Sequence, residues 1–129
     1  MNPFLLFGAL NGFLAVAFGA FGTHVLGGRI DPSLLEIWQT GVRYQMFHAV
    51  GLAIVGILED GSNPTRWLRL SGWMMLIGIL LFSGSLYLLV ATGIRKLGIV
   101  APFGGFAFLF GWLFFMIHAT RKREQWRIR

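Results

Sequence analysis

The chain has 129 residues, of which 56% are hydrophobic and only 12% are charged, and its formal net charge is +6. Soluble domains usually have a charged fraction of about 25%, so this composition excludes a soluble protein and predicts a membrane domain. Cysteine is absent, which excludes disulfides, thiol catalysis and cysteine-based metal sites. The basic residues collect at the ends of apolar segments, which indicates membrane topology rather than nucleic-acid binding.

The first apolar segment carries no charged side chain from Met1 to Leu26 and predicts a membrane-spanning helix. No basic residue precedes it, which favours a retained span over a cleaved signal peptide. Small residues recur in it at alternating spacings of four and three, which places them on one stripe of the helix. The stripe consists of Gly8, Gly12, Ala15, Gly19 and Gly22. Small residues let another backbone approach closely in lipid, so we expect helix packing along this stripe.

Three further apolar segments complete one predicted domain over residues 1–129, an all-α integral membrane four-helix bundle. The expected spans are about 4–24, 36–58, 67–92 and 97–120, with a basic tail at 121–129. Asp31 or Ser33 is expected to cap the second helix. Asn63 is expected to cap the third helix, with Pro64 in its first turn.

The distribution of basic residues predicts the orientation of the bundle. Seven of them are expected on the membrane side that holds both termini, and three on the other side. The seven are Arg66, Arg69, Arg121, Lys122, Arg123, Arg127 and Arg129, and the three are Arg29, Arg95 and Lys96. Because basic loops are retained in the cytoplasm, we expect both termini there.

Polar residues within the second and third spans predict a layer in the outer half of the membrane. This polar layer consists of Arg43, Tyr44, Gln45, His48, Ser83 and Tyr87. At 1.5 Å per residue, Arg43 to His48 lie roughly 10–18 Å below the outer surface. Polar groups inside a membrane are costly and normally face the bundle, so the layer is the candidate ligand site. Alternatively, these groups hydrogen-bond across helices. Arg43 either extends to the headgroups, binds an anion or has its guanidinium satisfied by carbonyl groups.

The remaining ionisable residues limit the possible chemistry. His24, His48 and His118 lie at three depths, so we do not expect a haem held by two histidines of one chain. No acidic residue lies at the membrane midplane, where a proton-coupled carrier needs one. The sequence shows no Ser–His–carboxylate set and no phosphate-binding loop. We therefore expect no enzyme activity, no catalytic residue, no metal and no cofactor.

Four motifs resemble those of the domain of unknown function 423 family. They are Gly19–His24, Trp38–His48, Phe82–Tyr87 and Ala101–Gly105. The family comprises small four-span membrane proteins, of the bacterial YgdD-like and the transmembrane protein 256-like kinds. The resemblance covers essentially the whole chain and implies the fold and a bacterial inner-membrane location. It implies no activity and supplies no catalytic residue.

Three functional hypotheses follow. The small-residue stripe and the short loops favour a non-enzymatic protein that acts by helix packing, as a homo-oligomer or an accessory subunit of a membrane complex. Its partners are then membrane lipids and other membrane chains, not nucleic acid. The second hypothesis is a carrier that binds a small molecule or lipid at the polar layer. The third is a redox subunit associated with haem or quinone.

Overall fold

The computed structural model describes residues 2–61 and 63–128, with side chains described up to Arg121. This part of the chain is helical apart from short loops, and it contains no strand. Helix α1 (Pro3–Phe21) continues into a π-helical turn, Gly22–Leu26. Helix α2 (Pro32–Glu59) begins at Asp31, whose carboxylate accepts the Ser33 backbone N–H at 2.9 Å. That bond lowers the pKa of Asp31 below its ordinary value.

The third helix contains a π-helical turn at its centre. It consists of α3 (Arg66–Gly78), the π turn Ile79–Ser83 and α4 (Gly84–Thr92). Gly93 ends it with a φ of 74°, a left-handed conformation that favours glycine. A 3₁₀ turn, Arg95–Ile99, then leads to α5 (Ala101–Ile128).

Four helical segments are long and apolar enough to cross a membrane. They are Pro3–Leu26, Pro32–Glu59, Arg66–Thr92 and Arg95–Arg121. The predicted all-α class, with four candidate membrane spans, is therefore confirmed for the described residues.

Two details at the helix ends differ from the sequence expectation. Thr65, rather than Asn63, caps α3, because its hydroxyl oxygen accepts the Leu68 N–H at 3.2 Å. The same oxygen lies 2.7 Å from His118 Nδ1, which ties the start of α3 to α5. The expected tail is helical through Ile128. Arg129 and the side chains of residues 122–128 lie outside the described part of the chain.

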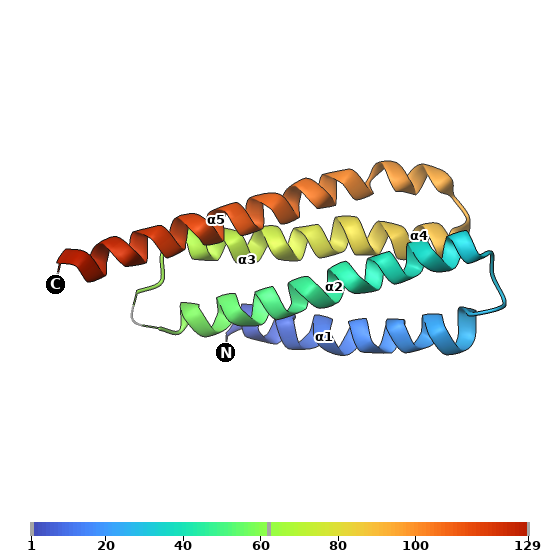
Figure 1. Cartoon of the computed structure of the whole chain (residues 1–129), viewed down its shortest axis with the longest axis horizontal. Helices are drawn as coiled ribbons and strands as arrows, with labels where there is room; N and C mark the ends of the chain where they lie inside the picture. Colours follow the sequence, from blue (N-terminus) through green and yellow to red (C-terminus); the bar gives the residue numbers. More distant parts are fainter. Residues whose placement is uncertain (1, 62, 129) are drawn as a thin grey trace.

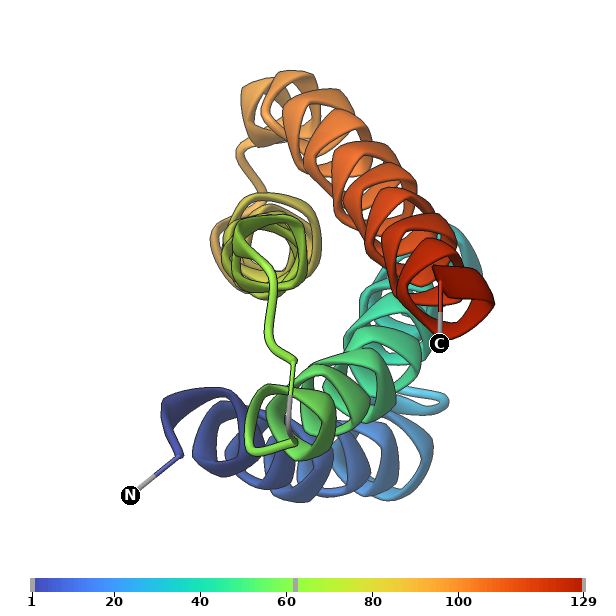
Figure 2. The ribbon, with the colours of Figure 1, turned by 90° about the vertical axis from the view of Figure 1, so that its left-hand side faces the viewer.

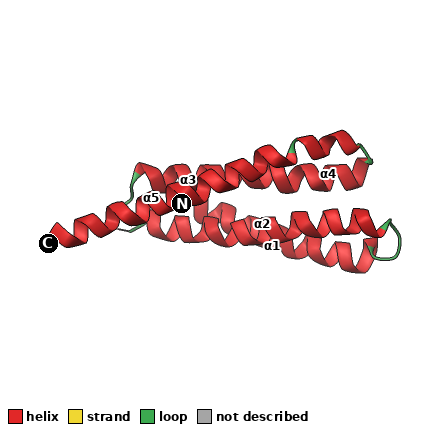
Figure 3. Cartoon of the chain, turned by 45° about the horizontal axis from the view of Figure 1, so that its top comes forward, coloured by secondary structure: helices red, strands yellow, loops and turns green. Residues whose placement is uncertain are grey.

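The helices form two close pairs, α1 with α2 and the α3–α4 helix with α5 (Figures 1 and 3). Figure 2, viewed along the bundle, shows the α3–α4 helix end-on with the α1–α2 pair below it. Both termini lie toward the same end of the bundle (Figure 1). The core is apolar and is formed by Phe4, Leu52, Val55, Leu68, Met75, Ile79 and Phe108.

The small-residue stripe of α1 packs mainly against α2 of the same chain. A Cβ atom added to Gly8 would lie 2.6 Å from the backbone nitrogen of Ala53, and one added to Gly22 would lie 2.7 Å from Trp38 Cδ1. A Cβ added to Gly12 would meet nothing within 4 Å. Of the other two members, Ala15 is fully buried and Gly19 lies close to Val42. The stripe therefore holds α1 to α2, and Gly12 alone is left in open space.

Candidate functional site

The structure divides the predicted polar layer into two groups that face different helices. Gln45, Ser83 and Tyr87 make hydrogen bonds within the bundle. Arg43, Tyr44 and His48 instead line a groove between α2 and α5. The six residues of the layer therefore lie in two groups with different surroundings.

The inward group forms a continuous hydrogen-bonded chain across three helices. The Tyr87 hydroxyl of α4 donates to Gln45 Oε1 of α2 at 2.7 Å. Gln45 Nε2 donates to Asn11 Oδ1 of α1 at 3.0 Å, and Asn11 Nδ2 donates to the Phe7 carbonyl at 2.8 Å. Each side-chain amide thus donates one hydrogen bond and accepts one. The sequence analysis did not name Asn11, although an amide side chain inside an uncharged span indicates a polar contact within the bundle.

The Ser83 hydroxyl also has a hydrogen-bond partner within the bundle. It lies at the end of the π turn and donates to the Gly41 carbonyl of α2 at 2.7 Å. Gly41 also faces the Tyr87 ring, since an added Cβ would lie 3.0 Å from Tyr87 Cε1. The inward group therefore hydrogen-bonds across helices, as in the structural alternative, and offers no unpaired group to a ligand.

His48 is held in one tautomer by two neighbours. Trp112 Nε1 can only donate, so the 3.0 Å contact makes His48 Nε2 an acceptor. The proton of the neutral ring is then on Nδ1, which donates to the Tyr44 carbonyl at 2.8 Å. The ring stacks on Phe108 with centroids 3.6 Å apart, and the residue is only 3% exposed.

This geometry leaves neither ring nitrogen of His48 free for a metal or a haem iron. Among the described residues, no group of three or more histidines and acidic residues is placed to hold a metal ion. The redox hypothesis therefore gains no support from the geometry of His48. Trp112, the partner that fixes the ring, was not predicted as part of the site.

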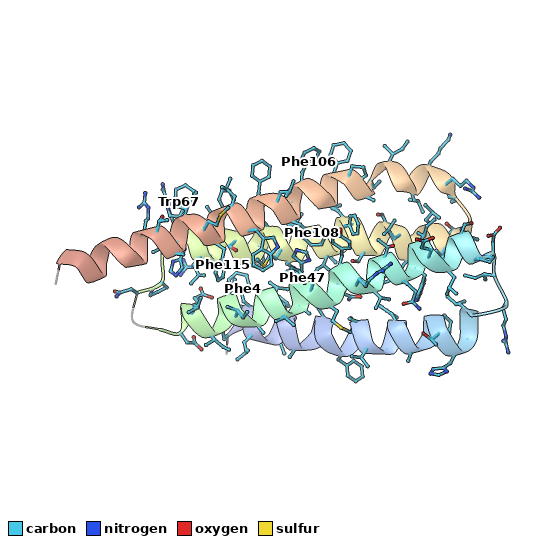
Figure 4. The ribbon with its side chains drawn as sticks, viewed as in Figure 1. Phe4, Phe47, Trp67, Phe106, Phe108 and Phe115 are labelled. Atoms are coloured by element: carbon cyan, nitrogen blue, oxygen red, sulfur yellow. The ribbon has the colours of Figure 1, made fainter. Side chains whose placement is uncertain are left out.

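The groove between α2 and α5 has a volume of about 700 Å³. Its walls are mostly aromatic, and Figure 4 shows Phe47 and Phe108 between the two helices. Phe108 and His48 are buried on its inner side, whereas Phe47 and Leu109 at its edges are 63% and 66% exposed. The complete lining is Arg43, Tyr44, Phe47, His48, Phe82, Pro102, Gly105, Phe106, Phe108, Leu109 and Trp112.

The groove is polar at one end only. Arg43 and Pro102 lie on the side of the groove nearest the beginnings of α2 and α5. Trp112 lies about 15 Å beyond Pro102 along α5. Arg43 Nη2 lies 3.4 Å from Thr40 Oγ1, a long contact directed toward the beginning of α2. Within the described residues, Arg43 has no acidic partner and the Tyr44 hydroxyl has no hydrogen-bond partner.

The groove combines apolar walls with a few polar groups. The walls present hydrocarbon and ring faces, and the buried His48–Trp112 pair satisfies its own donors and acceptors. Arg43, which has no acidic partner, and the Tyr44 hydroxyl are donors on the lining of the groove. Apolar walls with a few polar groups are the usual composition of a small-molecule pocket.

Comparison with known proteins establishes the family. Residues 18–105 match the family described as "Protein of unknown function (DUF423)". The chain is 45% identical over 121 residues to the UPF0382 membrane protein YwdK of Bacillus subtilis, an alignment that covers 94% of this chain and 98% of that protein. The chain belongs to the DUF423 family. This DUF423 protein is an integral membrane protein. Its bacterial relatives are named membrane proteins.

A second relative of this DUF423 protein is the UPF0382 membrane protein SERP0230 of Staphylococcus epidermidis. The two are 42% identical over 123 residues, which cover 95% of this chain and 98% of the relative. No solved structure matches the chain. The family match includes Arg43, Tyr44 and His48, whereas Asn11 and Trp112 lie outside it. Neither the family description nor the relatives' names give an activity.

Proposed function

We propose that this DUF423 protein binds a membrane amphiphile in the groove between α2 and α5. The observation that carries the proposal is the groove itself, about 700 Å³ of aromatic-lined space beside Arg43, which has no acidic partner, and the Tyr44 hydroxyl. Ligand pockets in proteins commonly have volumes of about 300–1,000 Å³ and a few polar groups that orient the ligand.

The position of the groove explains how such a ligand would enter. Its edges, including Phe47 and Leu109, are exposed on membrane-spanning helices, so a molecule already in the bilayer can enter sideways. Burial from water does not drive binding in lipid, where close packing and polar contacts do. An unpaired polar group in hydrocarbon costs several kcal/mol, and a ligand head group would relieve this cost at the Tyr44 hydroxyl and would supply Arg43 with a stronger partner than Thr40.

Gly105 provides a direct test of groove occupancy. It lines the groove, and a Cβ atom added to it would meet nothing within 4 Å, so Gly105→Leu places a larger apolar side chain in the groove. We expect native mass spectrometry to show one bound amphiphile on the gently extracted wild-type chain and at least about tenfold less on Gly105→Leu. Gly12→Leu is the matched control, because Gly12 is equally open but lies outside this groove. Equal occupancy of Gly105→Leu and wild type would contradict the proposal.

A second proposal concerns assembly of this protein with another membrane chain, as a homo-oligomer or an accessory subunit. It is supported by a shallower apolar groove of about 380 Å³ along α1 and α2. Ala9, Gly12, Ala49 and Ala53 are among its lining residues, and small residues permit close approach of another helix. Gly12, the stripe member left open, lies in this second groove.

Gly12→Leu is therefore expected to reduce assembly without preventing folding. A Cβ atom at this position meets nothing within 4 Å, whereas the leucine side chain would displace a helix packed on the groove. The measurement is the mass of the detergent-solubilised protein by light scattering, compared with wild type and with Gly105→Leu. An unchanged mass for Gly12→Leu would count against assembly through this surface.

We also propose that both termini face the cytoplasm, in the inner membrane of a bacterium. Arg66, Arg69 and Arg121 lie at the end of the bundle that holds the termini. The excess of basic residues at this end supports the orientation by the positive-inside rule. The groove then opens in the outer half of the membrane, with Arg43 toward the outer surface.

A further inference from the structure

We propose that the amphiphile in the groove carries an acidic head group, a phosphate or a carboxylate, which Arg43 binds at the end nearest the membrane surface. The inference rests on the proposed function of the groove and names the class of ligand that it takes. It is carried by the position of Arg43, by its lack of an acidic partner, and by the direction in which the polarity of the groove changes.

Arg43 is placed where the head of a lipid-like molecule would lie. It is the first residue of α2 to line the groove, and its Nη2 atom is directed toward Thr40, closer to the beginning of the helix. The guanidinium therefore lies on the surface-facing side of the groove rather than at its centre. A head group at this position would lie nearer the membrane surface than His48 and Trp112 do.

The charge of Arg43 has no counterpart in the described part of the protein. No aspartate or glutamate pairs with it, and its one hydrogen bond is the long contact to Thr40. A guanidinium presents a rigid fork of donors that matches a carboxylate or a phosphate, and it stays charged at any physiological pH. The Tyr44 hydroxyl, unpaired on the same groove, is a further donor for an acidic head.

The other end of the groove is suited to a hydrocarbon chain. His48 and Trp112 hydrogen-bond each other there, so they leave no donor unpaired. Phe108 stacks on the His48 ring, and Leu109 forms an apolar edge. The groove thus changes from charged at Arg43 to apolar beyond the His48–Trp112 pair, about 7.5 Å further along α2, in the same direction as one leaflet of a bilayer.

The test uses amphiphiles that share one chain and differ in head group. The full-length protein is placed in phosphatidylcholine nanodiscs and titrated with hexadecyl phosphate, palmitate or hexadecanol, and occupancy is measured by native mass spectrometry. We expect the two acidic probes to bind at least about tenfold more tightly than the alcohol, the difference typical of a charged hydrogen bond. An excess of inorganic phosphate is expected to displace hexadecyl phosphate poorly, because it lacks the chain.

Variants of Arg43 identify the group responsible. Arg43 is exposed and forms only one long hydrogen bond, so its replacement does not threaten the fold. We expect Arg43→Gln to lower acidic-probe affinity to that of hexadecanol, and Arg43→Lys to retain part of the preference. Equal affinities of all three probes for wild type, or an unchanged preference in Arg43→Gln, would overturn the inference. So would displacement by inorganic phosphate as effective as that by hexadecyl phosphate itself.

The Gly105→Leu variant separates this inference from the proposed function. If the acidic-head inference is wrong but the groove binds amphiphiles, Gly105→Leu loses all three probes while wild type binds them equally. If the groove binds no amphiphile, wild type and Gly105→Leu give the same signal with every probe. That second result overturns both the proposed function and the inference.

Discussion

Alanine at Gly104 is expected to destabilise the bundle, whereas alanine at the adjacent Gly105 is expected to be tolerated. A Cβ at Gly104 would lie 2.8 Å from the Cα atom of Phe82 and closer still to its backbone nitrogen. Phe82 belongs to the π turn of the third helix, so relief of the clash requires a shift of α5 or of that turn. A Cβ at Gly105 meets no atom within 4 Å.

The expected loss for Gly104→Ala is about 1–3 kcal/mol of unfolding free energy, the usual cost of overpacking. Gly105→Ala is expected to be neutral or slightly stabilising, because alanine favours a helix over glycine by about 1 kcal/mol. Unfolding by sodium dodecyl sulfate, followed by circular dichroism in mixed micelles, measures both. Equal stabilities of the two variants would show that α5 does not approach the π turn as closely as described.

Loss of Gln45 is expected to have the next largest effect on stability. Gln45→Met removes the acceptor of the Tyr87 hydroxyl and the donor to Asn11 Oδ1, and leaves both inside the bundle without those partners. We expect a loss of about 1–3 kcal/mol, since an unsatisfied buried polar group costs that much and membrane hydrogen bonds contribute modestly. The same unfolding titration measures it.

The control for Gln45 removes its partners as well. The triple variant Asn11→Leu, Gln45→Met and Tyr87→Phe leaves no unpaired side chain from this network, so it is expected to be more stable than Gln45→Met alone. A triple variant whose loss of stability equals the sum of the three single-variant losses would mean that the three residues act independently.

The four spans could be predicted because an uncharged apolar run long enough to cross a bilayer has few other uses. The predicted spans end near the observed helices, but the start of α3 was misplaced. Asn63 and Pro64 match a common starting pattern, whereas Thr65 caps the helix and also contacts His118 of α5. That contact joins residues 53 apart in sequence, and local pattern cannot anticipate it.

The members of the polar layer could be named from sequence, but not their division into two groups. Helical periodicity places Gln45 and His48 on neighbouring positions of α2, and it does not identify the helices on either side. In the structure Gln45 faces Asn11 and Tyr87, whereas His48 faces Trp112. The fold therefore turns one predicted layer into an internal network and a lateral groove.

The small-residue stripe shows the same limit. Its spacing predicts a packed face of the helix. It does not predict which helix packs there or which of the five residues that helix contacts. Gly8 and Gly22 meet α2 of the same chain, and Gly12, on the predicted stripe, does not. Of the stripe residues, we therefore expect only Gly12, in the groove along α1 and α2, to contact another membrane chain.

The most direct test of ligand binding in the groove is photolabelling with a fatty acid that carries a diazirine near the middle of its chain. The protein is labelled in membranes, and the modified residues are mapped by peptide mass spectrometry. Occupation of the groove predicts labels concentrated on Phe47, Leu109 and Trp112, reduced in Gly105→Leu but not in Gly12→Leu. Labels spread over outward-facing residues such as Phe13 and Leu80, and unchanged in Gly105→Leu, would contradict the account.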